Sequence, residues 1–105
     1  MKDSSYIINQ IKQTAKSFLP NSKIILFGSR ARKEENDESD YDILIITETT
    51  IDPKEKFPVR TKIRKALLKY NILSDILIQS DEEIKRKKNL PGHIIRTIIN
   101  EGICL

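Results

Sequence analysis

The stretch KIILFGSRARKEENDESDYDILIIT, residues 23–47, decides how the rest of the chain is interpreted. It contains an apolar run at residues 24–27, the dipeptide Gly28-Ser29, and a second apolar run at residues 41–46. Short runs rich in β-branched residues and bounded by turn residues are typical of buried strands. The passage from a strand through Gly-Ser into Arg-Ala-Arg predicts a helix N-terminus, where backbone N–H groups without partners favour an anion.

Asp40 and Asp42 open the second predicted strand. Side chains alternate between the two faces of a strand, so these two carboxylates are expected on the same face, followed there by Leu44 and Ile46. Neighbouring carboxylates repel each other unless a cation lies between them, and hard divalent cations prefer oxygen ligands. An anion-binding turn followed by paired acids predicts a site for a magnesium nucleotide.

The spacing of these residues resembles a known signature. Gly28-Ser29, ten intervening residues and then Asp40-Tyr41-Asp42 resemble the polymerase-β-like nucleotidyltransferases. Residues 27–32 (FGSRAR) and 39–44 (SDYDIL) are most similar to the minimal nucleotidyltransferases (MNT), the antitoxin partners of HEPN toxins. Lys33 departs from the pattern, because many members have Gly there, so the short helix expected at residues 30–33 must end in another way.

The resemblance covers nearly the whole chain and implies an α/β (α+β) fold with a small mixed β-sheet flanked by helices. We expect one minimal nucleotidyltransferase domain over residues 1–105, since a chain of this length with 38% hydrophobic residues can form a single core. The other elements follow from apolar periodicity, caps and breakers. They are a helix from Asp3 or Ser4 to before Pro20, a helix starting near Phe57 or Pro58, a strand at 72–78, a helix started by a capping box at 80–83, a helix after Pro91-Gly92 ended by Gly102, and a short strand at 103–105.

Asp75 lies between apolar residues of the strand expected at 72–78. An acid in a central strand is costly unless it is paired or bound to a metal. The third carboxylate of the family occurs at a matching point. The alternative is an aspartate on an edge strand that faces water, and a single sequence does not decide which strand lies at the edge.

The resemblance implies the chemical role of each acid. Asp40 and Asp42 are expected to hold two Mg²⁺ ions, as in two-metal sites generally. Asp75 is expected to hold the ion beside the acceptor and to take the proton of the acceptor hydroxyl. All three are thus predicted as both metal-binding and catalytic residues.

The resemblance also implies the substrate. Gly28, Ser29 and Arg30 are expected to bind ATP, with the first two at its β- and γ-phosphates. The implied enzyme is an ATP-dependent protein adenylyltransferase (EC 2.7.7 type) of a type VII-like toxin–antitoxin pair. It moves AMP from Mg-ATP to a tyrosine hydroxyl of the cognate HEPN toxin and so neutralises the toxin. Two alternatives stay open: a non-catalytic binding antitoxin, and the catalytic subunit of a two-chain small-molecule nucleotidyltransferase.

Composition and charge bound the partners. The net charge of +4 suits a nucleotide, a nucleic acid or an acidic protein. Nucleic acid is not expected as the direct substrate, because the basic run at residues 85–88 has no interleaved aromatic residues. We expect a hetero-oligomer, with a homodimer as the alternative for the chain alone, and a partner surface on the isoleucines at 94, 95, 98 and 99. No apolar run reaches the length of a membrane span, and the lone Cys104 agrees with a reducing cytoplasm.

Overall fold

The computed structural model describes residues 4–28 and 40–105. In this part of the chain, a four-stranded mixed sheet has the strand order β3-β2-β1-β4. Strand β1 (Lys23–Phe27) is antiparallel to both β2 (Tyr41–Thr47) and β4 (Ile103–Cys104), whereas β2 and β3 (Ser74–Ser80) are parallel. The predicted α/β fold with a small mixed sheet is therefore confirmed.

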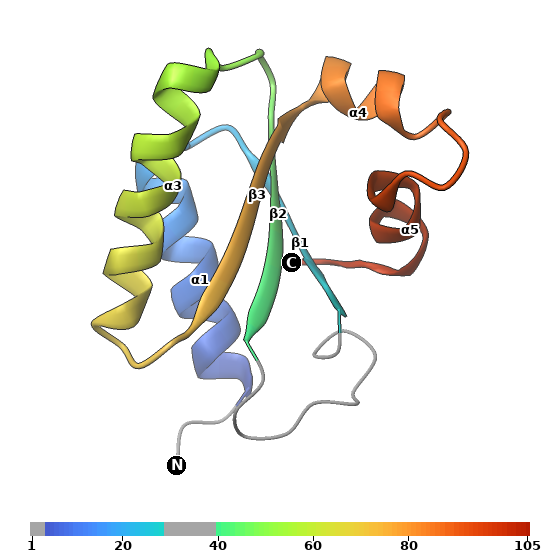
Figure 1. Cartoon of the computed structure of the whole chain (residues 1–105). Helices are drawn as coiled ribbons and strands as arrows, with labels where there is room; N and C mark the ends of the chain where they lie inside the picture. Colours follow the sequence, from blue (N-terminus) through green and yellow to red (C-terminus); the bar gives the residue numbers. More distant parts are fainter. Residues whose placement is uncertain (1–3, 29–39) are drawn as a thin grey trace.

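Helices cover both faces of this sheet (Figure 1). On one face lie α1 (Ser4–Phe18) and α3 (Pro53–Leu68), and on the other lie α4 (Asp81–Lys87) and α5 (Ile94–Glu101). A core cluster lies on each face, because successive strand residues point to opposite sides. Ile11 of α1 and Ile63 of α3 pack with Ile43 of β2 on the first face, whereas Ile95 of α5 packs with Leu44 of β2 on the second. Two-sided burial explains the continuous apolar sequences of β1 and β2.

Helix α3 corrects the predicted start near Phe57 or Pro58. It begins at Pro53, after the N-cap Asp52, whose Oδ1 accepts a hydrogen bond from the N–H of Lys54 at 2.9 Å. Pro58 lies inside the helix. A proline in a helix removes one backbone hydrogen bond, but near the N-terminal end this loss affects only the first turns. The buried Ile63 and Leu67 in later turns hold the helix on the sheet.

One further boundary differs from the sequence-based prediction. Strand β3 spans Ser74–Ser80 rather than 72–78, because the turn after α3 runs to Asn71, which has a positive φ of 60°, and residues 72–73 lie between that turn and the strand. Helix α5 starts at Ile94, with His93 as the N-cap that accepts a hydrogen bond from the N–H of Ile95 at 3.1 Å. The capping box of Ser80 and Glu83 is confirmed at the start of α4.

Candidate active site

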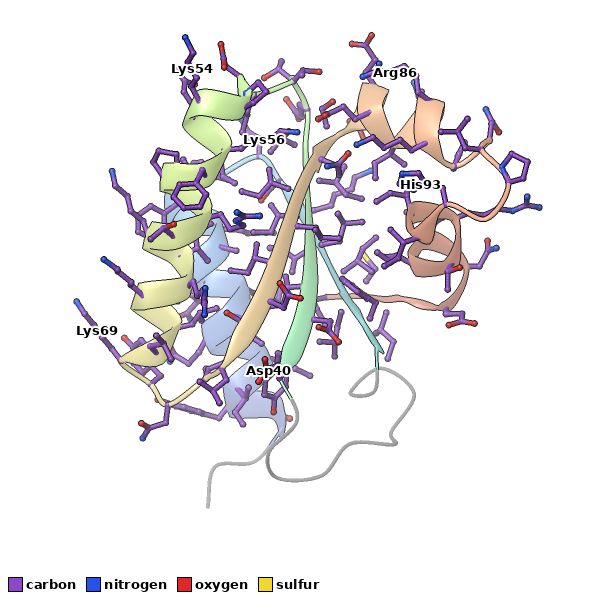
Figure 2. The ribbon with its side chains drawn as sticks, viewed as in Figure 1. Asp40, Lys54, Lys56, Lys69, Arg86 and His93 are labelled. Carbon is purple, nitrogen blue, oxygen red and sulfur yellow. The ribbon has the colours of Figure 1, made fainter. Side chains whose placement is uncertain are left out.

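Asp42 and Asp75 lie next to each other on neighbouring strands. In the parallel pairing of β2 with β3, Asp42 is the register partner of Asp75. In the antiparallel pairing of β1 with β2, Asp42 is also the partner of Phe27, the last residue of β1. Strand β1 therefore ends where β2 and β3 begin, and two acids from two strands share that end of the sheet. Asp40 lies just before β2 at the same end, as Figure 2 shows.

The face that carries Asp42 is the one covered by α4 and α5. Leu44 and Ile46, two and four residues after Asp42, pack in the core cluster with Ile84, Ile95 and Ile98. This confirms the predicted alternation along β2. At the start of β2 and β3, which those helices do not cover, the same face carries acids instead of core residues.

The three acids differ in their exposure. Asp42 is partly buried, whereas the side chains of Asp75 and Asp40 are exposed. The expectation that Asp75 sits in a central strand is wrong, because β3 is the last strand of the described sheet on that side. Asp75 is an edge-strand aspartate, which was the alternative left open, and it nevertheless lies beside Asp42. An exposed carboxylate at an edge does not need a partner to be tolerated.

Gly28 lies so close to Asp42 that a residue with a Cβ would not fit at this position. Its φ of +75° is in the region that favours glycine, and an added Cβ would overlap Oδ2 of Asp42. The sequence predicted Gly28 as a turn residue, and the structure adds this steric role. Ser29 and Arg30, the other predicted nucleotide-binding residues, lie outside the described residues, as does the short helix expected at 30–33.

The side-chain atoms available at this end of the sheet are of the kind that a magnesium ion prefers as ligands. The side chains of Asp40, Asp42 and Asp75 offer only carboxylate oxygens, and Mg²⁺ takes oxygen ligands. Across the two described ranges, however, no three His, Cys, Asp or Glu side chains are close enough together to hold a metal ion. The assignment of all three aspartates as metal ligands therefore stays a prediction.

A second polar cluster lies at the other end of β3. Lys56 of α3 donates to both carboxylate oxygens of Glu83 of α4, at 2.9 and 2.8 Å. Burial raises the pKa of Glu83, but the hydrogen bonds from Lys56 and from the Ser80 N–H, with the charge of Lys56, outweigh it and lower the pKa overall. In Figure 2 Lys56 points towards the sheet, whereas Lys54 and Lys69 point away.

The sequence analysis missed this ion pair. In the sequence, the capping box was enough to explain Glu83, and no local pattern relates this residue to a lysine 27 residues away. A pocket of about 390 Å³, lined by Leu19 and Thr47 among others, also lies at this far end of β2. Neither feature belongs to the acid-bearing end of the sheet.

Comparison with known proteins places this geometry in a family. Residues 9–105 match the family described as "Polymerase beta, Nucleotidyltransferase". An inferred protein adenylyltransferase of Methanocaldococcus jannaschii is 39% identical over 80 residues, which are 76% of this chain and 73% of the relative. A second one from that organism is 34% identical over 99 residues, which are 92% of this chain and 93% of the relative.

Solved structures share the fold at low sequence identity. A toxin–antitoxin complex with AMP-PNP gives a TM-score of 0.63 at 21% identity, covering 91% of this chain and 69% of that one. A complex of tri-AMPylated Shewanella oneidensis HEPN toxin with MNT antitoxin gives 0.57 at 18% identity, with 95% and 69% covered. An inferred nucleotidyltransferase of Sulfolobus solfataricus gives 0.57 at 23% identity, with 94% and 76% covered.

One further finding concerns membranes: among the described residues, no helix is both long and apolar enough to cross one. The match to the family profile extends over nearly the whole chain, from the middle of α1 to the last residue. It includes Gly28 and the three aspartates, so the resemblance read from the sequence motifs is confirmed. The chain therefore belongs to the polymerase β nucleotidyltransferase family, with inferred protein adenylyltransferases among its relatives.

Proposed function

We propose that this chain transfers AMP from ATP to a tyrosine hydroxyl of a partner protein, a HEPN-type toxin, and thereby neutralises that toxin. The observation that carries the proposal is the pairing of Asp42 with Asp75 beside Gly28. Two relatives above 30% identity are inferred protein adenylyltransferases, which favours a protein as the acceptor. The complex of MNT antitoxin with HEPN toxin shares this fold and suggests the class of partner.

The transfer step follows from the positions of the acids. The acceptor oxygen attacks the α-phosphorus of ATP, the bond from that phosphorus to the bridging oxygen breaks, and pyrophosphate leaves. Asp75 is exposed and receives the hydroxyl proton. A tyrosine hydroxyl has a pKa near 10, about three units above neutral pH, so a neighbouring base promotes its attack.

Asp40, Asp42 and Asp75 would hold Mg²⁺, which when bound neutralises charge on the attacking and leaving oxygens. Gly28 allows the backbone to approach the triphosphate closely, because no side chain intervenes. Ser29 and Arg30 follow it and are proposed to contact the phosphates. Positioning and charge neutralisation then provide most of the catalysis, since phosphoryl chemistry asks for little covalent participation by the protein.

The described elements include no separate acceptor-binding domain: after β2 come only α3, β3, α4, α5 and β4, all packed on the same sheet. We propose that residues 1–105 act as one minimal nucleotidyltransferase domain and that the partner supplies the acceptor in a hetero-oligomer. A non-catalytic binding antitoxin would bind the same partner without modifying it. A two-chain small-molecule enzyme would modify a small alcohol or amine and leave the partner unchanged.

The test is to incubate the chain with ATP, Mg²⁺ and the HEPN-type partner, and to weigh the partner by mass spectrometry. We expect added AMP units on a tyrosine, and none with Asp42→Asn. Asp75→Ala should lower the transfer rate by about 10²–10⁴-fold, the usual contribution of a general base, while sparing much of the ATP affinity. A partner bound tightly but never modified by the wild-type chain would favour the binding antitoxin and reject the enzyme.

Metal dependence is tested separately by calorimetry. The acids repel the triphosphate unless a divalent cation is present, so ATP should bind with Mg²⁺ and lose most of its affinity after chelation. The ATP affinities of Asp42→Asn with Mg²⁺ and after chelation should differ less than those of the wild-type chain, because one of the repelling charges is gone. Equal ATP affinity of the wild-type chain with and without chelator would reject the metal assignment.

A further inference from the structure

Leu73 extends the pairing of β2 with β3 by one position. Tyr41 and Ser74, the first residues of the two strands, are register partners. The N–H of Tyr41 donates a hydrogen bond to the C=O of Leu73 at 2.9 Å, which continues this parallel ladder. One step back along both strands, Leu73 therefore lies beside Asp40.

The side chain of Leu73 lies on the acid-bearing face of the sheet. Ile72, Ile76 and Ile78 are all buried in the core cluster that includes residues of α1 and α3. Alternate residues of an extended chain share a face, so Leu73 points to the opposite side together with Asp75. Helices α4 and α5 lie on that side but do not reach this end of the strands (Figure 1).

Four side chains therefore share this end of the face, two from the β2 side and two from the β3 side. Such positions are about 6.6 Å apart along a strand and about 4.8 Å apart across neighbouring strands. The four are Asp40, Asp42, Leu73 and Asp75. Three of them are carboxylates, and the fourth is an apolar side chain that is 52% exposed. An apolar surface is thus available directly beside the acids.

The exposure of Leu73 is fixed by its neighbours in the chain. Ile72 is 2% exposed and Ser74 is 7% exposed, so both anchor the backbone on either side of Leu73. Its C=O is also held by Tyr41, so Leu73 cannot turn into the core without breaking these contacts. Single exposed leucines are common on protein surfaces, but this one is held in place next to three acids. A contact between Leu73 and a ligand would require no rearrangement of the chain, which favours binding.

We propose that Leu73 binds the aromatic ring of the acceptor tyrosine and determines the specificity of the transfer for an aromatic hydroxyl. This inference rests on the proposed adenylyl transfer and names the residue that recognises its acceptor. Packing of the ring on Leu73 removes apolar surface of both groups from water, which is favourable in proportion to the area buried.

The spacing of Leu73 and Asp75 matches the length of a tyrosine side chain. The two positions are about 6.6 Å apart, and a tyrosine has a similar length from its Cβ to its hydroxyl oxygen. A ring that packs on Leu73 and points along β3 therefore brings its hydroxyl to the carboxylate that is proposed to take the proton. The other neighbour of Asp75 on this face, Leu77, is partly buried against the core cluster beneath α4 and α5. The exposed apolar surface next to Asp75 is consequently that of Leu73.

The proposed contact distinguishes tyrosine from other acceptors. The hydroxyl of a serine is bonded directly to Cβ, so a serine that reaches Asp75 offers no ring to Leu73. A small molecule with several hydroxyl groups would place polar groups against an apolar side chain, which is unfavourable unless they keep their hydrogen bonds. Leu73 therefore favours an aromatic acceptor over the small alcohol of the two-chain alternative.

Binding of a ring at Leu73 is tested by NMR of the leucine methyl groups in the full chain. The probe is the peptide GGYGG, added with Mg²⁺ and α,β-methylene-ATP, which cannot release AMP. The controls are GGFGG, which has a ring without a hydroxyl, and GGSGG, which has a hydroxyl without a ring. We expect the methyl signals of Leu73 to move upfield with both ring-bearing peptides, because an aromatic ring shields protons above its plane, and not with GGSGG. The methyl signals of Leu90, which is 50% exposed between α4 and α5, should not move.

Substitutions test whether this contact serves the reaction. Leu73→Ala should lower kcat/KM for AMP transfer to the HEPN-type partner about tenfold, a usual effect of a lost apolar contact on specificity. Leu73→Met keeps an apolar side chain of similar volume and should keep most of the wild-type kcat/KM. Leu90→Ala removes a similarly exposed leucine far from the acids and should transfer AMP at the wild-type rate. ATP affinity should be unchanged in all three variants, because the acids and Gly28 are intact.

Each outcome decides between the two proposals. If the Leu73 methyl signals do not move with GGYGG while the HEPN-type partner accepts AMP on a tyrosine, the proposed function stands and this inference fails. Equal kcat/KM of Leu73→Ala and the wild-type chain would also overturn the inference, and so would a loss of ATP affinity as large as the loss of transfer. If the signals move with the ring-bearing peptides but no AMP is transferred under any condition, Leu73 is an aromatic binding site and the proposed function fails. If neither is observed, both fail.

Discussion

Asp42 and Asp75 are register partners on parallel strands, so their backbones lie about 4.8 Å apart at one end of the sheet. Two carboxylates this close repel each other in the absence of a cation. Neither apolar packing nor the sheet requires an acid at these positions, because Leu44 and Leu77, two residues further along each strand, carry the packing on that face. The pair is therefore best explained by what it binds.

Gly28 should be required for its closeness to Asp42 and not only for its backbone conformation. Gly28→Ala and Gly92→Ala place alanine at nearly the same positive φ, +75° and +74°, so each should lose about 1 kcal/mol of folding free energy. Of these two glycines, only Gly28 places the added Cβ against a side chain, that of Asp42. ATP binding measured by calorimetry should fall for Gly28→Ala and stay at the wild-type level for Gly92→Ala. Equal ATP affinity in both variants would reject the steric role.

Ser74 and Ser80 should respond in opposite directions to substitution by alanine. Oγ of Ser74 is buried without a hydrogen-bond partner in the described structure, so Ser74→Ala should raise the free energy of unfolding by about 1 kcal/mol. Oγ of Ser80 accepts from the N–H of Glu83 at 3.1 Å and pairs with Oγ1 of Thr50 at 2.8 Å. Ser80→Ala should therefore lower that free energy by about 1–2 kcal/mol. Urea denaturation checks both values, and a loss of stability in Ser74→Ala would contradict the first.

The Lys56–Glu83 ion pair should make stability depend on pH. The folded-state pKa of Glu83 lies below its usual value of 4.5, so its contribution is complete above that value and is lost as the pH falls through the folded-state pKa. At pH 7, Glu83→Gln should be less stable than the wild type by about 1.5–3 kcal/mol. The difference in the free energy of unfolding between the wild type and Glu83→Gln should narrow in urea titrations repeated at decreasing pH below 4.5. A gap that stays constant over this range would show that the charge of Glu83 does not matter.

The four isoleucines of α5 should fall into two pairs that respond differently to substitution by aspartate. Ile95 and Ile98 are each 2% exposed and belong to the core, whereas Ile94 and Ile99 are 56% and 38% exposed. Ile94→Asp should change the free energy of unfolding by less than about 0.5 kcal/mol, whereas Ile98→Asp should unfold the chain by burying a charge. Size-exclusion chromatography with the HEPN-type partner should show a weakened complex for Ile94→Asp, because exposed apolar groups mark interfaces. Unaltered complex formation by Ile94→Asp and Ile99→Asp would remove α5 from the interface.

Local chemistry was enough to predict much of the fold. The end of β1 at Phe27, the capping box at Ser80 and Glu83, and the placement of Asp42 with Leu44 on one face were all predicted correctly. Each depends on residues within a few positions of one another, either through strand alternation or through a cap hydrogen bond. Gly28 and the Asp-x-Asp pair were singled out for the same reason.

Other features depended on contacts between distant segments. Helical periodicity grouped Ile94 with Ile95, and only the position of α5 against the sheet shows that one is exposed and the other is buried. The ion pair of Lys56 with Glu83 joins two helices and had no local signal. In α3, Pro58 is a helix breaker by propensity, but burial of later residues such as Leu67 outweighs that local preference.

The sequence by itself determined that two acids and a glycine turn would share one end of a strand pair, because alternation and spacing are properties of the chain. Only the tertiary structure decided that Asp75 stands beside Asp42 and that β3 is the last strand of the described sheet on that side, because strand order and register are set by packing between distant segments. Burial of Ile76 and Ile78 against α1 and α3 holds that register, and Asp75 consequently faces the other side, beside Asp42.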